Sequence, residues 1–254
     1  MEANALLSSL DPLQVVFVAF AAFAGSVTAG LSGMGGGMLL AVALSPIVGI
    51  QALIPIMTVT MLINHIARVG AFRRNISWVI AGRVMVTALP LTVLGASVYA
   101  ALPPRAVALV LGLFVLVFVP ARRLLGDSAW RLGASGLMGV GGLFGFISGT
   151  AMGAGMILIP VLLGMGLSGG ALVGTDAVIG LAVLVVKAIT FGTLAVLNTE
   201  LVVFGVVVGL ITTPGVYFAR WIIRRTSVRL HTAIIEVILL LGGASFVWRG
   251  VSGN

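Results

Sequence analysis

The 254-residue sequence contains no cysteine. Without thiols the chain forms no disulfide, carries no thiol redox relay and binds no metal or iron–sulfur cluster through cysteine. Histidine is almost as scarce, because His65 and His231 are the only two and lie far apart, without the spacing of metal ligands. The sequence therefore indicates no metal site and no cofactor.

Charged residues are also scarce, since Asp, Glu, Lys and Arg make up 8% of the chain, whereas hydrophobic residues make up 60%. A soluble domain carries about 25% charged residues, so we interpret the chain as an integral membrane protein. Apolar runs such as 13–31, 79–102 and 201–217 are continuous, which predicts transmembrane helices instead of the alternating strands of an outer-membrane barrel. No hydrophilic stretch is long enough for a soluble domain, so we predict a single transmembrane domain over 1–254.

The few charges are mostly positive, with 14 lysines and arginines against 6 acidic residues and a formal net charge of +8. In a soluble protein this charge would suggest nucleic acid as a partner. In a membrane protein it is typical of cytoplasmic loops that face anionic lipid, so we expect a lipid bilayer and no nucleic acid. The acidic N-terminus lacks the basic region of a cleavable signal peptide, and we interpret the first apolar run as a permanent span.

Glycine is abundant and concentrated in a stretch that occurs twice. The first copy is Gly-Leu-Ser-Gly-Met-Gly-Gly-Gly-Met at 30–38, and the second is Gly-Phe-Ile-Ser-Gly-Thr-Ala-Met-Gly-Ala-Gly-Met at 145–156. Each glycine costs a helix about 1 kcal/mol relative to alanine, so we expect the helices to break at both stretches. Bare backbone inside a membrane is tolerated only where protein buries it or where it lines a water-filled cavity. We therefore expect a substrate to bind there.

The apolar runs divide into two halves of five segments each. The segments are 13–31, 38–50 (broken by Pro46), 52–71, 79–102 and 105–119, then 132–148, 156–167, 171–197, 201–223 and 230–248. An overlay of the halves aligns Arg68 with Lys187 and Pro90 with Pro214. We accordingly predict repeat 1 at 12–120, a cytoplasmic linker at 121–132 and repeat 2 at 133–250.

The arginines favour inverted repeats. The segments 38–50 and 156–167 are shorter than the roughly 20 residues that a full crossing needs, so each either crosses or turns back as a re-entrant segment. If all ten segments cross and the N-terminus lies outside, most loop arginines lie on the cytoplasmic side, as the positive-inside rule requires. If both short segments were re-entrant, the two repeats would point the same way and the loops at Arg73 and Arg224 would lie on opposite sides of the membrane, which fits the charges less well. We therefore predict inverted repeats with cytoplasmic basic loops.

Lys187 is the only lysine and lies deep in an apolar segment, where a charge costs at least about 2.5–3.5 kcal/mol. We interpret it as an anion contact or a gating partner; a structural pair with Asp176 or snorkelling to the interface are the alternatives. Arg68 is its counterpart in the overlay, and arginine is well suited to oxyanions. Arg68 is also close enough to the basic loop 73–75 to snorkel to the surface.

Other polar residues lie in the same two segments. Asn64 precedes Arg68 by one helical turn and shares its face. His65 can carry a proton near neutral pH or make an interhelical hydrogen bond, and Asp176 can hold a proton or a cation or cap a helix that starts after Gly174. We name His65 and Asp176 as candidates for proton coupling. No nucleophile and base have a recognisable spacing, so the sequence indicates no enzyme.

The glycine motifs supply the other candidates. A half-helix N-terminus presents free N–H groups and the positive end of a helix dipole, which suit an anion. Small residues spaced by four, as at Gly33–Gly37 and Gly149–Gly153, also let helices pack closely without a ligand. The predicted substrate-binding residues are Ser32, Gly33, Gly35, Gly36, Gly37, Asn64, Arg68, Ser148, Gly149, Thr150, Gly153, Gly155 and Lys187.

With the motif at 30–37, its second copy at 145–160 and the arginine-rich turn at 73–78, the sequence resembles the TauE/SafE sulfite exporter family over essentially the whole chain. The family pattern has a proline soon after the first glycine run, whereas this sequence has Val42 there and keeps Pro160 in the second copy. The resemblance implies transport of sulfur oxyanions or organosulfonates, such as sulfite or sulfoacetate, coupled to protons.

These observations together predict an all-α, polytopic secondary transporter in the cytoplasmic membrane of a prokaryote. We expect it to export its anion by alternating access, with broken helices at the glycine motifs, either alone or as a homodimer. The alternatives are an anion channel, which would conduct without coupling or saturation, and a transporter of another small organic anion or of a cation. A metal-cation transporter would need buried carboxylates, for which Asp176 and Glu236 are the candidates.

Overall fold

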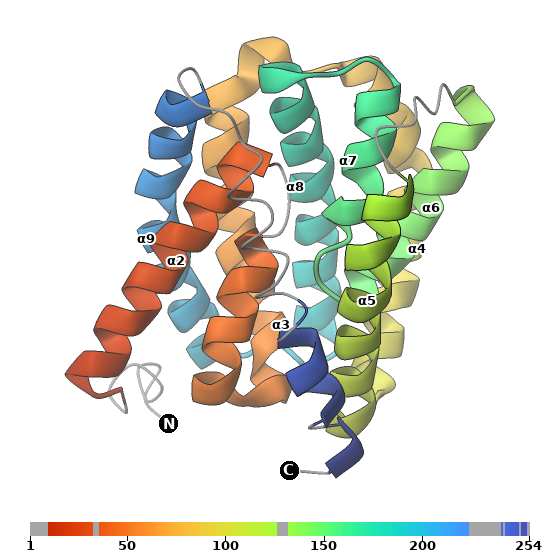
Figure 1. The fold of residues 1–254 in the computed structure, drawn as a ribbon. Helices are drawn as coiled ribbons and strands as arrows, with labels where there is room; N and C mark the ends of the chain where they lie inside the picture. The colour runs from red at the N-terminus through yellow and green to blue at the C-terminus, as the bar shows by residue number, and fades with distance from the viewer. Residues whose placement is uncertain are drawn as a thin grey trace.

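The structure is a computed structural model that describes residues 10–32, 36–125, 132–223, 240, 242–248 and 250–252. Within these ranges the secondary structure is helical and contains no strand. The elements are α2 (Pro12–Ser32), α3 (Gly36–Phe72), the 3-10 turn η1 (Arg73–Asn75), α4 (Trp78–Ala101), α5 (Pro104–Leu125), α6 (Ala134–Thr150), α7 (Gly155–Gly164), α8 (Gly169–Thr193) and α9 (Thr199–Ile223). The helices stand side by side as a bundle (Figure 1).

Five of the helices are long and apolar enough to cross a membrane. They are Pro12–Ala29, Gly36–Asn75, Trp78–Ala101, Gly169–Thr193 and Thr199–Ala219. Large apolar side chains such as Phe20, Val86 and Leu210 are exposed on the outside of the bundle, where lipid takes the place of water. The predicted all-α, multi-pass membrane fold is therefore confirmed.

α3 consists of two helical pieces that meet at Gly49, where φ is 74° and ψ is 165°. Glycine adopts this backbone conformation without the steric cost that a side chain would add. Pro46 lies inside the first piece and does not interrupt it. The break that the sequence analysis expected at Pro46 is therefore not observed, and the helix breaks at Gly49 instead. The two pieces correspond to the second and third predicted segments, and the second piece carries Arg68.

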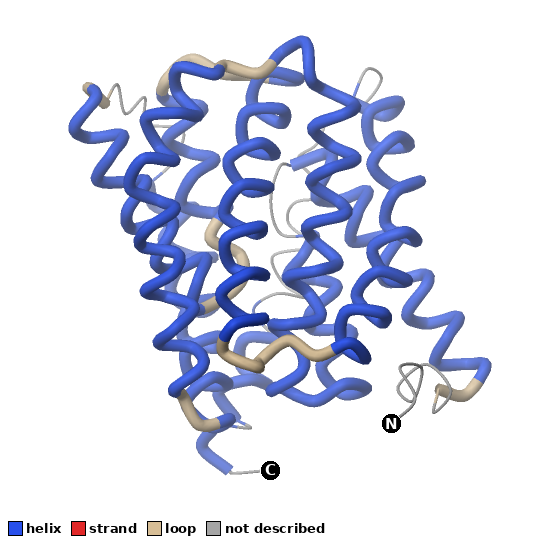
Figure 2. Tube along the Cα trace, turned by 180° about the vertical axis from the view of Figure 1, so that it is seen from behind, coloured by secondary structure: helices blue, strands red, loops and turns tan. Residues whose placement is uncertain are grey.

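α6 and α7 are separated by the short segment 151–154, which lies about midway between the two ends of the bundle (Figure 2). In Figure 1, α6 runs down from the upper end and α7 runs back up. α7 has 10 residues and therefore rises about 15 Å, roughly half the hydrocarbon thickness of a bilayer. The predicted segment 156–167 is thus a half-helix that turns back to the end where α6 begins.

Glycines on one face of α6 explain how closely it packs against α4. Gly141, Gly145 and Gly149 are spaced by four, and a Cβ at any of them would overlap the backbone of α4. For Gly149 the overlapping groups would include the carbonyl oxygen of Thr92. Close helix packing, the alternative that the sequence left open, therefore accounts for Gly149.

The predicted linker and last segment are only partly described. α5 continues to Leu125, so the linker predicted at 121–132 begins as helix, and residues 126–131 lie outside the described ranges. Of the predicted segment 230–248, the structure describes residues 240 and 242–248. Among the described helices, α3 packs against α2, α5, α8 and α9, and α8 packs against α3, α4, α6 and α7.

Candidate functional site

A partly open cavity of about 140 Å³ lies between α3 and α8 and is also lined by residues of the two glycine motifs. The predicted site residues that line it are Gly36, Gly37, Asn64, His65, Arg68, Ser148, Gly153, Gly155, Asp176 and Lys187. Gly149 and Thr150 lie outside this lining. Gly33 and Gly35 lie outside the described residues, and the side chain of Ser32 is not described.

Three charged side chains are buried in the described part of the chain: Arg68, Asp176 and Lys187, with exposed fractions of 2%, 4% and 2%. All three line the cavity. A charge inside a membrane protein is costly and is placed where a partner, water or a ligand compensates it. The convergence of all three on one cavity therefore marks this cavity as the candidate site.

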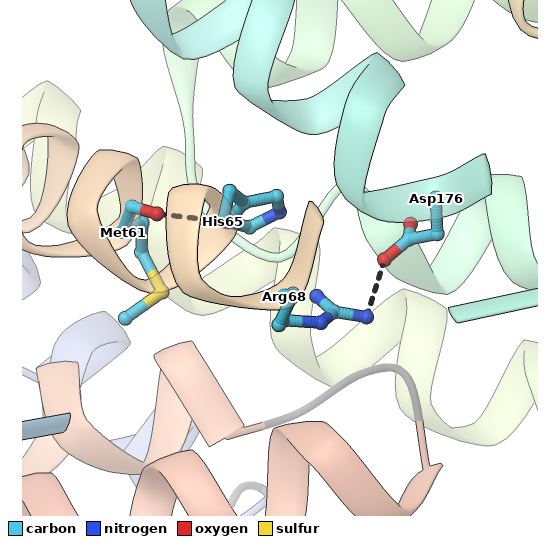
Figure 3. Close-up of polar contacts among 4 residues, drawn as sticks. All are labelled: Met61, His65, Arg68 and Asp176. Carbon is cyan, nitrogen blue, oxygen red and sulfur yellow. Dashed lines mark hydrogen bonds and ion pairs between the residues drawn. The ribbon is translucent and has the colours of Figure 1, made fainter. Parts of the chain in front are cut away.

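Arg68 forms a buried ion pair with Asp176. The Nη2 group of Arg68 donates a hydrogen bond to Oδ2 of Asp176 over 2.9 Å, and the two side chains face each other across the gap between α3 and α8 (Figure 3). The burial of Arg68 excludes snorkelling to the surface. Asp176 does not cap α8, which begins at Gly169, and its salt-bridge partner is Arg68 instead of Lys187.

The guanidinium of Arg68 retains donor capacity toward the cavity. An arginine side chain has five N–H donors in a rigid fork. The buried Nε of Arg68 has no hydrogen-bond partner among the described residues. Because Arg68 lines the cavity, an oxyanion there can accept hydrogen bonds from a group that is already held in place by Asp176.

Lys187 is held by backbone carbonyls and not by a carboxylate. Its Nζ donates hydrogen bonds to the carbonyl oxygens of Ser148 over 2.6 Å and Ala151 over 3.2 Å, and it lies 5.3 Å from the centre of the Phe191 ring. Helix α6 ends at Thr150 because Ala151 is extended. The carbonyls at this end carry the negative end of the α6 dipole, so the ammonium group stabilises the break between α6 and α7.

Residues that line the cavity recur at the same intervals along α3 and α8, a pattern that the sequence analysis missed. On α3, Met57 and Met61 precede Arg68 by eleven and seven residues, and on α8, Asp176 and Gly180 precede Lys187 by the same intervals. Eleven residues are close to three helical turns. Each set therefore lies on one face of its helix, and this spacing was a signal available in the sequence.

His65 is bonded within its own helix. Its Nδ1 donates a hydrogen bond to the carbonyl oxygen of Met61 over 2.8 Å (Figure 3), which leaves Nε2 as an acceptor. A Cβ at Gly180 would lie 2.5 Å from this Nε2. Gly180 therefore allows α8 to approach the imidazole, and the interhelical hydrogen bond considered for His65 is not the one observed.

Asn64 connects the cavity wall to helices α2 and α9 through hydrogen bonds. Its Nδ2 donates to Oγ of Ser26 over 3.0 Å, and that hydroxyl donates to the carbonyl oxygen of Thr212 over 2.5 Å. The Asn64 Oδ1 atom is buried and has no hydrogen-bond partner among the described residues. α2, α3 and α9 are thus connected by one buried polar chain that ends at the cavity.

The two glycine motifs meet at the cavity. Gly153 has a φ of 83°, and a Cβ there would lie 2.6 Å from Sδ of Met38, which belongs to the first motif. α3 begins at Gly36 and α7 begins at Gly155, and both glycines line the cavity. The positive ends of two helix dipoles therefore lie at a site that also contains two buried cations.

The chemistry of this arrangement favours an anion. The described residues contain no group of three or more His, Asp or Glu that could hold a metal ion. Two cations and one carboxylate leave the cavity walls with a net positive charge. A cavity of about 150 Å³ admits a molecule as large as benzene, so the observed volume accommodates a small oxyanion.

Comparison with known proteins identifies one match. The sequence model of a protein family described as "Sulfite exporter TauE/SafE" matches residues 17–246. No curated protein and no solved structure matches the chain. The matched range includes all the described residues that line the cavity.

Proposed function

The chain belongs to the TauE/SafE sulfite exporter family, and on this premise we propose that it exports a sulfur oxyanion or organosulfonate that binds in the cavity between α3 and α8. The family is one of membrane transporters and implies a sulfite or sulfonate exporter. The proposal assigns the substrate site to Arg68, Lys187 and the first turns of α3 and α7. It makes Lys187 and Arg68 the charges that attract the anion.

One observation carries this proposal. The three charged side chains buried in the described residues all line a single cavity, and two of them are positive. A site for a cation would place carboxylates in excess, whereas the one carboxylate among the described residues of the lining is already bonded to Arg68. The charge balance therefore supports an anion over the alternative of a cation.

We further propose transport by alternating access between inverted repeats at 12–120 and 133–250. The support is that both halves contain a helix, a glycine motif and a short helix in the same order. Since segment 156–167 turns back, the expectation that all ten segments cross is wrong, and the inverted repeats are supported instead by helix direction: in Figure 1, α2 runs upward from its N-terminal end and α6 runs downward. We place the N-terminus outside and the linker 121–132 inside a prokaryotic cytoplasmic membrane, with protons as the coupling ion and His65 or Asp176 as the carrier.

The test is saturable transport of a sulfur anion by the purified protein in proteoliposomes. Labelled sulfite is expected to exchange against internal sulfite, with unlabelled organosulfonates as competitors. Lys187→Ala is expected to abolish the exchange, whereas Arg83→Ala, at an exposed arginine of α4, leaves it intact. In parallel, a ligand at 100 times its Kd raises the stability of the wild type by about 2.7 kcal/mol.

Three results would contradict the proposal or favour an alternative. Exchange that persists in Lys187→Ala would remove Lys187 from the site. Flux that rises linearly with concentration, without saturation, would favour an anion channel. Stabilisation by carboxylates or cations, but by no sulfur anion, would favour a transporter of another small ion.

A further inference from the structure

Resting on the proposed function, we propose that Asp176 is an internal anion that the transported anion replaces at Arg68, and that Asp176 takes up one proton as it is displaced. Proton coupling is thereby assigned to Asp176 and not to His65. Of the two buried cations, Arg68 is paired with a carboxylate that a proton can neutralise, whereas the hydrogen-bond acceptors of Lys187 are backbone carbonyls.

The geometry makes Asp176 and an oxyanion competitors for the same guanidinium. The Arg68–Asp176 contact of 2.9 Å joins α3 to α8, and both residues line the cavity. An oxyanion that enters the cavity can accept hydrogen bonds from the same N–H groups of the guanidinium, of which only Nη2 is bonded to the Asp176 carboxylate. The unpartnered Nε of Arg68 provides a first contact from which the anion can displace the carboxylate.

A displaced carboxylate must lose its charge. An ionised carboxylate buried without a counter-cation is costly enough that the group becomes protonated instead. In the proposed step the Asp176 carboxylate accepts a proton from the side to which the cavity is open, and an O–H bond forms. The Arg68–Asp176 ion pair is exchanged for an ion pair between Arg68 and the transported anion.

The charge of the cavity explains why one proton accompanies one anion. Arg68 and Lys187 are positive and Asp176 is negative, which gives the described lining of the cavity a net charge of +1. A monovalent anion that binds together with one proton leaves this net charge unchanged. A dianion such as sulfate that binds with one proton would change the net charge from +1 to 0. We therefore take monoanions, such as hydrogen sulfite or ethanesulfonate, as the ligands that keep the charge of the cavity constant.

The other titratable and charged groups on the elements packed against α8 do not offer the same exchange. They are His65 and Arg68 on α3, Arg83 and Tyr99 on α4, Arg73 and Arg74 in η1, and Lys187 on α8 itself, while α6 and α7 contribute none. Arg73, Arg74 and Arg83 are exposed. His65 donates to Met61 within its own helix, and Lys187 is bonded to carbonyls that do not titrate.

The test measures binding of ethanesulfonate, which remains a monoanion at every pH used. In the wild type, one proton taken up per anion weakens binding by up to about tenfold for each pH unit of increase between pH 5 and pH 8. In Asp176→Asn, which resembles the protonated aspartate, the Kd is expected to be independent of pH. At pH 8 it is also expected to be lower than that of the wild type, because the internal competitor is gone.

His65→Gln is the matched control, because it removes the other titratable group of the cavity wall. It is expected to keep the pH dependence of ethanesulfonate binding. Loss of the dependence in His65→Gln, together with its persistence in Asp176→Asn, would overturn the inference and assign the proton to His65.

A second measurement needs only the wild type and remains decisive if Asp176→Asn fails to fold. With aspartate labelled by ¹³C at the side-chain carboxyl, the infrared difference spectrum on addition of ethanesulfonate should lose a carboxylate band and gain a band of protonated carboxylic acid, both shifted by the label. Binding without these bands would overturn the inference while the proposed function stands. If neither ethanesulfonate nor sulfite binds at any pH, the result would instead contradict the proposed function itself.

Discussion

The two cations of the cavity occupy matching positions on α3 and α8 but are bonded in opposite ways. Arg68 is paired with the carboxylate of Asp176, whereas Lys187 is bonded to the carbonyls of Ser148 and Ala151 at the end of α6. The first partner is a side chain whose charge a proton can remove. The second is backbone, whose dipole is permanent. One side of the cavity is therefore suited to exchange and the other to holding the break between α6 and α7.

The difference also predicts how each side responds to mutation. Removing one member of a buried ion pair leaves an uncompensated charge. Removing a cation from backbone carbonyls leaves only unpaired acceptors, which cost less. Substitutions on the Arg68 side should thus be repaired by a second substitution, and those on the Lys187 side should not.

The largest effect is expected for Arg68→Met. The substitution leaves the Asp176 carboxylate buried without its partner and should lower the free energy of unfolding by about 3–5 kcal/mol. Reversible unfolding in mixed micelles, followed by tryptophan fluorescence, measures the change. The double variant Arg68→Met/Asp176→Leu removes both charges and should recover most of the loss. A double variant as unstable as the single one would show that the pair does not act as a unit.

A smaller effect is expected for Lys187→Met, which leaves no unpaired charge. Each lost hydrogen bond from an ammonium group costs about 1.5–3 kcal/mol, but the variant also removes the desolvation cost of a buried charge, so we expect a net decrease in the unfolding free energy of about 1.5–3 kcal/mol. The same unfolding measurement applies, with Arg83→Met as a control at an exposed position. A loss as large as that of Arg68→Met would mean that the two sides of the cavity are not bonded as differently as the contacts indicate.

Much of the fold was predictable because the bilayer leaves few choices. Continuous apolar runs predicted helices, and the helical, multi-pass fold is confirmed. The break at Gly49 lies close to the predicted boundary between segments 38–50 and 52–71, whereas the break expected at Pro46 is not observed. A proline in a helix leaves the helical φ available, whereas the positive φ at Gly49 is a conformation that glycine adopts without the steric cost of a side chain.

The candidate site was predictable in its members but not in its bonds. Arg68, Asp176 and Lys187 stand out in the sequence because buried charges are costly. Their partners depend on contacts between distant segments, since Arg68 and Asp176 are 108 residues apart. The acceptors for Lys187 are backbone carbonyls, which any residue type supplies. The substrate-binding roles of these residues stay predictions.

The part of the cavity around Lys187 can be tested by substituting Gly153, which lies in the break between α6 and α7. Gly153 and Gly166 have φ values of 83° and 84°, but a Cβ would meet Met38 at Gly153 and nothing within 4 Å at Gly166. Alanine at either position costs about 1–2 kcal/mol for the backbone alone. Gly153→Ala should cost about 1 kcal/mol more, because the added methyl group must push Met38 aside.

The functional contrast between these two variants is expected to be larger than their difference in stability. Gly153→Ala should weaken ethanesulfonate binding, because Met38 lines the cavity, whereas Gly166→Ala should not. Adding Met38→Ala to Gly153→Ala should restore the lost stability in part. Equal binding by both single variants would show that the contact of Met38 with Gly153 does not shape the site.

The smallest effect is expected for Ser148→Ala. This variant distinguishes the role of the backbone carbonyl at the end of α6 from the role of the Ser148 hydroxyl. Lys187 is bonded to the Ser148 carbonyl and not to its hydroxyl, so the variant keeps that contact, and the unfolding free energy should change by no more than about 0.5 kcal/mol. If the hydroxyl binds the anion, as predicted from the sequence, the Kd for ethanesulfonate should rise by about twofold to tenfold, the contribution of one hydrogen bond.

An unchanged Kd would remove the hydroxyl from the site and leave Lys187 as the only side chain of this side that holds the substrate. A loss of stability comparable to that of Lys187→Met would instead mean that the hydroxyl, and not the backbone dipole alone, fixes the end of α6.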